Sequence, residues 1–287
     1  MTPTLIELVC EGLENLRDRG EERLSVDDSA RAILRKWLRS PQKAAPPPAS
    51  SPPAPVSLLA ACHSPRDIAP ETASRAPETV EEKLAFLLRR AEHWPPARRL
   101  GTLRDTMVFA TGNPHAQLML VGEAPGFDEE RLREPFVGRA GQKLDQIIAA
   151  MGLKREELYI SNICKFRPAI AGGNQGTANR APSDEEIAAC LPLILAEIRA
   201  IQPRCIICLG GTAAKGLLGS AGSVSSLRGR FHEVQGVPAR VTYHPSYLLR
   251  NETLSAKRAV WEDMLAVMER LGMPVTERQS RYFLSAR

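Results

Sequence analysis

Two stretches, Val121-Gly-Glu-Ala-Pro-Gly126 and Glu134-Pro-Phe-Val-Gly-Arg-Ala-Gly-Gln142, decide how the rest of the chain is interpreted. The apolar run Leu118–Val121 leads into the first stretch, and such a run followed by Gly-x-x-Pro-Gly predicts a buried strand that ends in a rigid turn. Open α/β sheets place their sites at strand tips, which makes Glu123 the first candidate site residue. Phe136 lies in a loop between a proline and a glycine, where an aromatic ring implies that something packs on it.

Strand and helix patterns alternate around this region. Strands separated by helices predict a parallel sheet with helices on both faces. The predicted fold class is therefore α/β, with three layers and a central four-stranded parallel sheet flanked by helices. The predicted strands are Leu118–Val121, Leu158–Ser161, Cys205–Leu209 and Arg240–Tyr243, and the main predicted helices lie near residues 80–94, 141–151, 183–201, 212–218 and 255–271.

Each predicted strand delivers a distinctive residue at its C-terminal end: Glu123, Asn162, the pair Gly210-Gly211, and His244. In a parallel sheet these ends share one edge, so residues far apart in the sequence converge. A carboxylate, an amide, an imidazole and the ring of Phe136 suit a planar, hydrogen-bonding ligand. The carboxylate can orient a water or stabilise positive charge on a sugar, and the imidazole can stabilise a departing group.

Composition divides the chain into four segments. The spacing of apolar residues predicts a small helical segment over residues 1–40. The composition of residues 41–78 predicts a Pro/Ala/Ser-rich disordered linker. Residues 79–273 hold the α/β domain, which opens with the capping-box pattern Thr79–Glu82, and residues 274–287 form a C-terminal tail. Because short helices cannot make much of a core alone, we expect residues 1–40 to dock on the domain or to bind a protein partner.

The bulk composition is ordinary for a globular protein. The hydrophobic fraction is 43%, and no apolar run reaches the length of about 18 residues that a membrane-spanning helix needs. The formal net charge of +5 is compatible with a polyanion partner, although many ordinary enzymes share such a charge. The first residues lack the basic region of a secretory signal, so we expect a cytoplasmic location.

The six cysteines do not suggest a disulfide framework, which a reducing cytosol would disfavour. The only C-x-x-C pattern is Cys205-Ile-Ile-Cys208, and it lies inside an apolar run. We interpret this pair as buried strand thiols rather than metal ligands.

A series of short motifs in a fixed order resembles the type-4 uracil-DNA glycosylases over roughly residues 84–271. Each motif is weak alone, but the order and spacing together are specific. The motifs are Gly122–Gly126, Pro135–Gly138, Ala140–Gln142, Tyr159–Asn162, Lys165 with Arg167-Pro168, Arg228-Gly229, and His244–Arg250. The resemblance implies a four-stranded parallel sheet between helices. It also implies cleavage of the N-glycosidic bond of deoxyuridine after the base is flipped out of the DNA.

The resemblance also implies roles for individual residues. Glu123 would position the hydrolytic water, Glu129 would be a second acid on the same loop, and His244 would stabilise the leaving uracil anion. The implied substrate-binding residues are Ala124, Pro125, Gly126, Phe136, which stacks on uracil, and Asn162, which reads its polar edge. The implied DNA-binding residues are Lys165, Arg167, Arg228, Ser246, Leu248, Leu249 and Arg250, of which Leu248–Arg250 form an intercalating loop.

Taken alone, several of these residues also fit structural roles. Phe136 could be a core ring, Asn162 could cap a turn, and Glu129 could be a solvated acid. Leu248–Leu249 could be core beneath a loop, and Arg228 could be a surface charge.

The sequence departs from the family at the cofactor. The resemblance implies a [4Fe–4S] cluster held by four cysteines, yet only Cys190 matches a ligand position. No cysteine lies near Pro95 and Arg98, where the first pair should fall, and Phe166 occupies the third position. One aligned thiolate cannot hold this cluster, so we predict a protein with no metal and no cofactor. The insertion Ala169–Asn179 is also long and lies beside the expected pocket.

The predicted function is therefore a monofunctional DNA-repair glycosylase that removes uracil from DNA, acts as a monomer and has no membrane partner. One alternative is a DNA-binding member of the same fold that has lost or altered catalysis. Another is a glycosylase for a different base such as hypoxanthine, because an asparagine can pair with several base edges.

Overall fold

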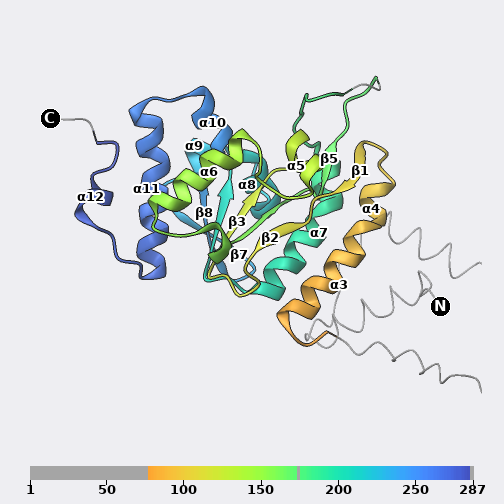
Figure 1. Ribbon diagram of the computed structural model, residues 1–287, viewed down its shortest axis with the longest axis horizontal. Helices are drawn as coiled ribbons and strands as arrows, with labels where there is room; N and C mark the ends of the chain where they lie inside the picture. The colour runs from red at the N-terminus through yellow and green to blue at the C-terminus, as the bar shows by residue number, and fades with distance from the viewer. Residues whose placement is uncertain (1–76, 173–174, 285–287) are drawn as a thin grey trace, which may run out of the picture. The chain divides into compact units, whose positions relative to one another are not determined.

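The computed structural model describes residues 77–172 and 175–284. The predicted helical segment 1–40 and all but the last two residues of the predicted linker 41–78 therefore lie outside the described residues. The described residues belong to one compact unit, which holds the whole α/β domain (Figure 1).

A six-stranded sheet in the order β2-β4-β3-β6-β8-β7 runs through the middle of this domain (Figure 1). Its four inner strands pair in parallel, whereas β2 and β7 pair antiparallel at the two edges. The predicted four-stranded, wholly parallel sheet is thus corrected to a mixed sheet of six strands. The strands are β2 (Ala110–Gly112), β3 (Leu118–Gly122), β4 (Tyr159–Asn162), β6 (Cys205–Leu209), β7 (Phe231–Val234) and β8 (Val237–Thr242).

Helices cover both faces of the sheet, which gives three layers. Helices α3, α4, α7, α8 and α9 cover one face, and α6 and α11 cover the other. The helices are α3 (Val80–Glu92), α4 (Pro95–Arg98), α7 (Asp184–Ile201), α8 (Gly211–Leu218), α9 (Val224–Leu227), α6 (Arg139–Ala150) and α11 (Leu254–Leu271). Within the described part of the chain, no helix is long and apolar enough to cross a membrane.

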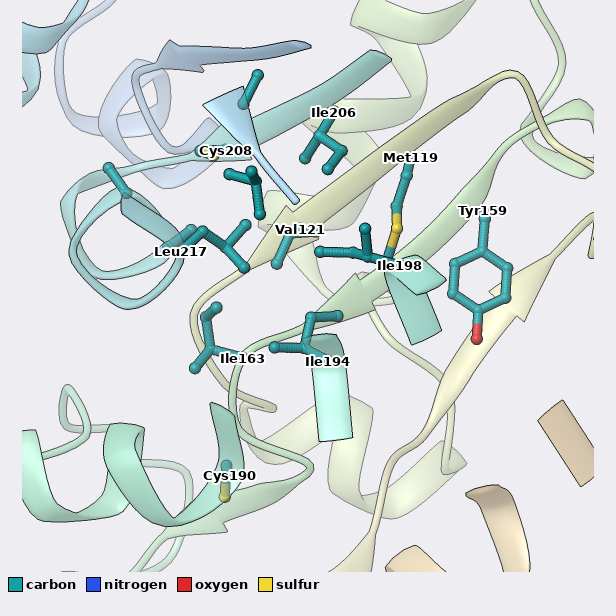
Figure 2. Packing of buried hydrophobic residues seen from close by; sticks show 14 of the residues in the cluster. Met119, Val121, Tyr159, Ile163, Cys190, Ile194, Ile198, Ile206, Cys208 and Leu217 are labelled. Carbon is teal, nitrogen blue, oxygen red and sulfur yellow. The ribbon is translucent and has the colours of Figure 1, made fainter. Parts of the chain in front are cut away.

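Alternation along the strands assigns side chains to these two faces. On β3, Met119 and Val121 join the α7 and α8 side, whereas Leu118 and Leu120 join the α6 and α11 side. Figure 2 shows the first of these cores, in which Ile194 and Ile198 of α7 and Leu217 of α8 pack on the strands. Each fully buried aliphatic side chain contributes about 1.5–3 kcal/mol, so both faces support the sheet edge that carries the site.

Local signals fix the ends of the helices next to the site. Thr79 and Glu82 form a capping box at the start of α3, and Ser183 and Glu186 form another at the start of α7. Gly138 is the N-cap of α6, directly after the loop that carries Phe136. Helices α3 and α7 therefore begin where their capping patterns predict, whereas α6 begins at Arg139, two residues before the predicted start.

Shorter elements complete the domain. Strands β1 and β5 form a separate antiparallel pair, and helices α5 and α10 follow the strand tips of β3 and β8. The remaining elements are α5 (Phe127–Leu132), α10 (Pro245–Arg250), β1 (Leu103–Met107), β5 (Phe166–Pro168), the 3-10 helix η1 (Arg155–Glu157) and α12 (Glu277–Ser280).

The predicted C-terminal tail, residues 274–287, is corrected in its described part. This part contains α12, and Gln279 ties it to the domain through its backbone oxygen, which accepts from Trp261 Nε1 at 2.6 Å. The Gln279 side chain also donates to the backbone oxygen of Ala150 at 2.9 Å. The packed domain therefore extends beyond residue 273.

Candidate active site

The tips of β3, β4 and β8 meet at one cavity of about 450 Å³. Glu123 follows β3, Asn162 ends β4, and His244 precedes α10 after β8. Because β3 and β4 pair in parallel with Gly122 opposite Asn162, Glu123 lies directly beside the β4 tip. Phe136 lines the same cavity, so four side chains spread over more than 120 residues converge as the strand topology predicts.

Phe136 is held in an unusual backbone conformation, with φ at 57° in the left-handed region. Its side chain is 6% exposed, and its ring is tilted by 33° to the ring of His244, with 5.8 Å between the centroids. A Cβ atom on Gly122 would overlap the Phe136 ring and Asn162 Oδ1, and one on Gly141 would overlap the Phe136 backbone. The two glycines are therefore required for the ring to reach the cavity.

We expect Gly122→Ala to lower the rate of the reaction catalysed at this cavity by about 100-fold or more, because it displaces both the ring and the amide. The matched control is Gly211→Ala, whose Cβ would meet only Val224 at an ordinary 3.5 Å. Single-turnover kinetics on both variants, with circular dichroism to verify folding, check this expectation. Equal rates for Gly122→Ala and the control would contradict it.

Asn162 is 2% exposed, and no described group hydrogen-bonds its Oδ1 atom. An unpaired polar atom in such a buried position costs about 1–3 kcal/mol, so native proteins seldom leave one without a reason. Asn162 is among the residues that line the cavity. The arrangement suits a ligand that supplies the missing donor.

Glu123 lines the cavity and is held from behind by a hydrogen bond to one of its two carboxylate oxygens. Thr212 Oγ1 donates this hydrogen bond to Oε2 at 2.7 Å. The Glu123 backbone oxygen accepts from the backbone N–H of Cys164 at 3.0 Å, which fixes the main chain beside the β4 tip. No pattern in the sequence pointed to Thr212 as a site residue.

His244 is oriented by the residue two positions later. The backbone N–H of Ser246 donates to Nδ1 at 3.2 Å, and Ser246 Oγ lies 2.8 Å from the same atom. Burial, with a smaller contribution from the charge of Arg250, lowers the pKa of His244 to about 4. The imidazole is therefore neutral at physiological pH, and with Nδ1 accepting, its proton resides on Nε2.

Glu129, predicted as a second catalytic acid, holds two loops together instead. Its Oε2 accepts from the backbone N–H of Gly126, and its Oε1 accepts from those of Val137 and Gly138, at 2.9–3.1 Å. Both oxygens are thus engaged with backbone donors, which corrects the prediction of a catalytic role. The carboxylate fixes the loop of Ala124, Pro125 and Gly126, which lines the cavity together with Glu129 itself.

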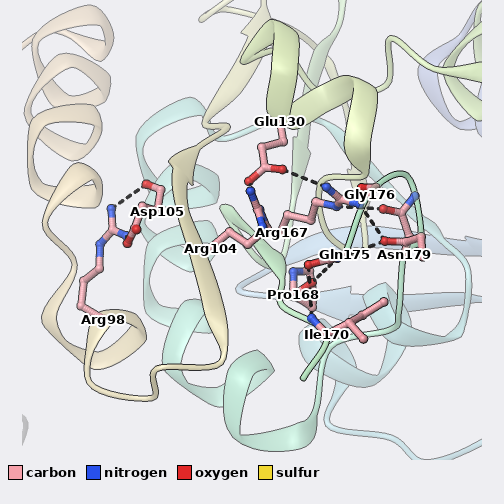
Figure 3. Close-up of polar contacts among 11 residues, drawn as sticks. Arg98, Arg104, Asp105, Glu130, Arg167, Pro168, Ile170, Gln175, Gly176 and Asn179 are labelled. Atoms are coloured by element: carbon pink, nitrogen blue, oxygen red, sulfur yellow. Dashed lines mark hydrogen bonds and ion pairs between the residues drawn. The ribbon is translucent and has the colours of Figure 1, made fainter. Parts of the chain in front are cut away.

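Arg167, predicted to bind DNA, is 1% exposed. Its guanidinium donates to Asn179 Oδ1 and Glu130 Oε2 at 2.9 Å each, and to the backbone oxygens of Gly176 and Ala178 (Figure 3). Its Nε, Nη1 and Nη2 atoms all donate hydrogen bonds within the fold, and the side chain is buried. The prediction that Arg167 contacts a phosphate is therefore wrong. Arg167 folds the described part of the insertion back onto α5.

This insertion supplies cavity residues that the sequence analysis missed. Asn179 and Arg180 line the cavity. Arg180 is fixed by Glu186 at 2.6 Å and by the backbone oxygen of Ala169. The available signal was the position of the insertion beside the predicted pocket, which pointed to the segment but not to individual side chains.

Lys165, also predicted to bind DNA, is fully buried and cannot contact a phosphate. Its Nζ lies 2.5 Å from Glu197 Oε1 and donates to Ser161 Oγ and to the backbone oxygen of Asn162. Ser161 and Tyr159 donate to the second oxygen of Glu197. The ion pair therefore anchors the tip of β4 to α7.

We expect Glu197→Ala to lower the free energy of unfolding by about 3–5 kcal/mol, because it leaves the Lys165 ammonium buried and unpaired. The double variant Lys165→Met/Glu197→Leu removes both charges and should recover most of that loss. Urea unfolding of the three proteins measures the difference. A double variant no more stable than Glu197→Ala would contradict this account of the pair.

Arg228 is the third predicted DNA contact that is engaged internally. Its Nε donates to Asp263 Oδ2 at 2.6 Å, and its side chain is 15% exposed. Arg240 pairs with the other oxygen of the buried Asp263 at 2.9 Å. The charge of Arg228 is thus matched within the fold, and its predicted phosphate contact is corrected to a structural role.

The predicted intercalating loop forms α10, and its residues differ in exposure. Leu248 is 4% exposed and packs with Ala256 and Val260, so it is core rather than a free wedge. Leu249 is half-buried, and Arg250 is exposed at the rim of the cavity. Of the predicted loop, the structure leaves Leu249 and Arg250 accessible.

The residues at the expected cluster position do not fit an iron–sulfur centre. Phe166 is fully buried, and the Arg98 guanidinium carbon lies 4.4 Å from the centroid of its ring. Trp94 Nε1 donates to the backbone oxygen of Ala189, next to the buried Cys190, at 2.6 Å. An aromatic ring and a cation occupy the place where thiolates would be needed. No three His, Cys, Asp or Glu side chains within residues 77–172 and 175–284 could hold a metal ion together.

The C-x-x-C pair does not form a site either. Cys205 belongs to the core on the α6 and α11 side of β6, and Cys208 to the core on the α7 and α8 side. Burial raises the pKa of Cys205 to about 11 and that of Cys208 to about 12. Two protonated thiols on opposite faces of a strand cannot share a metal ion, which agrees with their interpretation as buried strand thiols.

Comparison with known proteins assigns the domain to a family. Residues 109–265 match the family described as the Uracil DNA glycosylase superfamily. The chain is 39% identical to the type-4 uracil-DNA glycosylase of Thermotoga maritima, over 56% of this chain and 81% of the relative. It is 38% identical to the type-4 uracil-DNA glycosylase of Archaeoglobus fulgidus, over 51% and 73% of the two chains. It is 34% identical to that of Pyrobaculum aerophilum, over 60% and 86%.

The fold and the match of residues 109–265 define a member of the uracil DNA glycosylase superfamily. Within that superfamily the chain belongs to the type-4 uracil-DNA glycosylases.

Proposed function

We propose that this protein is a DNA-repair glycosylase that hydrolyses the N-glycosidic bond of deoxyuridine in DNA. It releases uracil and leaves an abasic site. Relatives of which the chain covers 73–86% carry the name type-4 uracil-DNA glycosylase, which supports this activity. The observation that carries the proposal is the buried Oδ1 of Asn162, which has no hydrogen-bond partner among the described residues although Asn162 lines the cavity.

Uracil supplies the hydrogen-bond donor that Asn162 Oδ1 lacks. The flipped base stacks on Phe136, and its ring N–H donates to Asn162 Oδ1 while the Asn162 amide donates to the adjacent carbonyl. Cytosine has an acceptor where uracil has the ring N–H, so it would leave Oδ1 unpaired. A site built to pair with a substrate group rejects analogues that lack it, because its own buried polar atoms then stay unsatisfied.

The bond breaks between the deoxyribose C1′ and N1 of the base, and the electron pair leaves with uracil. His244, neutral with its proton on Nε2, donates to the carbonyl oxygen on which negative charge develops. The carboxylate of Glu123 stabilises the positive charge on the sugar and orients a water. The water oxygen bonds to C1′, its proton passes to the carboxylate and then to solvent, and the uracil anion takes up a proton from solvent.

Contacts with DNA come from the rim of the cavity. Arg250 is exposed there and can meet a phosphate, and Leu249 can replace the flipped base in the stack. Ser246 contributes indirectly, through its hydrogen bonds to His244. One chain supplies every group that the reaction uses, which supports a monomer as the active form.

The reaction needs no iron–sulfur cluster in this protein. The stacking of Arg98 on Phe166 joins α4 to β5, and the hydrogen bond from Trp94 to Ala189 joins the start of α4 to α7, where a cluster would otherwise cross-link the fold. Water and side-chain electrostatics supply the chemistry. Stoichiometric iron in the purified protein, with broad absorbance near 400 nm, would contradict this part of the proposal.

Cleavage of oligonucleotides at alkali-labile sites tests the function. We expect cleavage with uracil opposite guanine or in a single strand, because unstacking costs least there. Hypoxanthine opposite guanine or thymine is included because it shares the carbonyl and ring N–H edge of uracil. Binding to DNA that falls with salt, without cleavage of any substrate, would instead favour a DNA-binding protein that has lost catalysis.

A further inference from the structure

The catalytic carboxylate has one hydrogen-bonding side chain behind it. Thr212 Oγ1 donates to Glu123 Oε2 at 2.7 Å, across a sequence separation of 89 residues. No other described side chain is recorded in a hydrogen bond with this carboxylate. Thr212 is not among the residues that line the cavity, so it touches Glu123 from the protein side.

The sheet topology explains why these two residues meet. Strand β6 pairs in parallel with β3, and Cys208 lies opposite Val121. The turn after β6 therefore ends level with the turn after β3, and Thr212 is the second residue of α8, which starts there. A side chain in the first turn of α8 points back toward the tip of β3.

The turn that presents Thr212 is fixed by the other catalytic side chain. Gly210 has φ at 93°, and a Cβ atom there would lie 2.9 Å from the Cβ of His244. The Gly210 N–H also donates to the backbone oxygen of Thr242, at the end of β8, at 2.9 Å. The position of the Thr212 hydroxyl is thus tied to the strand end that carries His244.

A glutamate has three side-chain torsions, and a catalytic group must be held within about 0.5 Å of its productive position. A charge-assisted hydrogen bond to one oxygen restricts these torsions and leaves the other oxygen free. We propose that Thr212 is a positioning residue, which holds Glu123 so that its free Oε1 faces the hydrolytic water. The proposal rests on the proposed function, because it assigns Glu123 to the attack of water.

The test compares three side chains at position 212 by single-turnover excision of uracil. Thr212→Val keeps the shape and removes the hydroxyl, and we expect it to lower the maximal rate by about 10- to 100-fold. The DNA concentration at half-maximal rate should stay within about twofold, because Thr212 does not contact DNA. Thr212→Ser keeps the hydroxyl and should restore the rate to within about threefold of wild type.

A double-mutant cycle separates positioning from a general structural effect. In the Glu123→Ala background, Thr212→Val should have no further effect, because the group through which it acts is gone. A wild-type rate for Thr212→Val would overturn the proposal, as would an equal loss of rate with and without Glu123. A lower melting temperature that accounts for the loss, without rescue by Thr212→Ser, would also overturn it.

The result for the wild type separates this inference from the proposed function. Wild-type protein that leaves uracil in DNA would overturn the proposed function, and the role of Thr212 with it. Wild-type protein that excises uracil while Thr212→Val is equally fast would overturn only the role of Thr212.

Discussion

Glu123→Gln is expected to lower the single-turnover rate of uracil excision by about 10²- to 10⁴-fold. The amide keeps the size of the side chain but removes the negative charge, so it neither stabilises a cationic sugar nor accepts a proton from the water. The fold should be retained, because within residues 77–172 and 175–284 the carboxylate hydrogen-bonds no side chain other than the hydroxyl of Thr212. The measurement is the rate at which alkali-labile sites appear with enzyme in excess over DNA.

The matched control is Asp128→Asn, which neutralises an acid on the neighbouring helix α5. Asp128 is half exposed, makes only a long 3.6 Å ion pair with Arg131, and does not line the cavity. We expect its rate to stay within about threefold of wild type, since exposed ion pairs contribute little. Excision by Glu123→Gln at the rate of this control would remove Glu123 from the mechanism.

His244→Ala is expected to lower the excision rate by about 10²- to 10³-fold, the usual cost of losing one donor to a developing anion. Binding of uracil-containing DNA should change much less, because the donor acts mainly as charge accumulates on the leaving base. His115→Ala is the control, since His115 is an exposed histidine that pairs with Glu81 and does not line the cavity. A His244→Ala variant as fast as this control would contradict the assigned role.

The low pKa of His244 makes it possible to test whether the neutral or the protonated imidazole is the hydrogen-bond donor. With a folded pKa of about 4 against an ordinary 6.5, the imidazole stays neutral in the folded protein throughout the range from about pH 5 to 8. Glu123, Glu129, Arg180 and Arg250 are the other titratable groups in the cavity wall. We expect the excision rate of the wild type to show no titration step near pH 6.5 that can be assigned to His244. A step assigned to His244 would be absent from the pH profile of His244→Ala. A rise toward acid with that midpoint would show that the imidazolium is the active form.

The same shift has a consequence for stability. Because the folded pKa lies below the unfolded value, the unfolded chain takes up the proton first as the pH falls. The contribution of neutral His244 is complete above about pH 6.5 and is lost as the pH falls toward 4. This loss overlaps the acid part of the pH range in which excision is compared, so folding is verified at each pH.

The convergence of the site was predictable from the sequence because it depends on topology. Apolar runs separated by helices place Glu123, Asn162 and His244 at ends of parallel strands, whatever the details of the loops. The edge strands were not predictable in this way. Strand β2 has three residues, and the turn between β7 and β8 uses Gln235 and Gly236 with positive φ at both, a weaker hairpin signal than Asn-Gly.

The charged residues show why the other site assignments could not be made from the sequence and required the three-dimensional structure. Lysine and arginine are rarely buried, so Lys165 and Arg167 next to a strand tip suggested a surface for DNA. Their partners, Glu197 and Glu130, lie 32 and 37 residues away, and neither spacing has a recognisable pattern. Thr212 is a similar case, since an ordinary helix residue acquires a role only through the pairing of β6 with β3.

The most direct test of the account is to measure free uracil, by mass spectrometry, after metal-free protein is mixed with a single-stranded oligonucleotide that carries one uracil. The account predicts one uracil and one intact abasic strand per oligonucleotide from the wild type, and release slowed by at least about 100-fold from Asn162→Ala. Oligonucleotide that is bound but returns with its uracil in place would contradict the account, as would equal release by the two proteins.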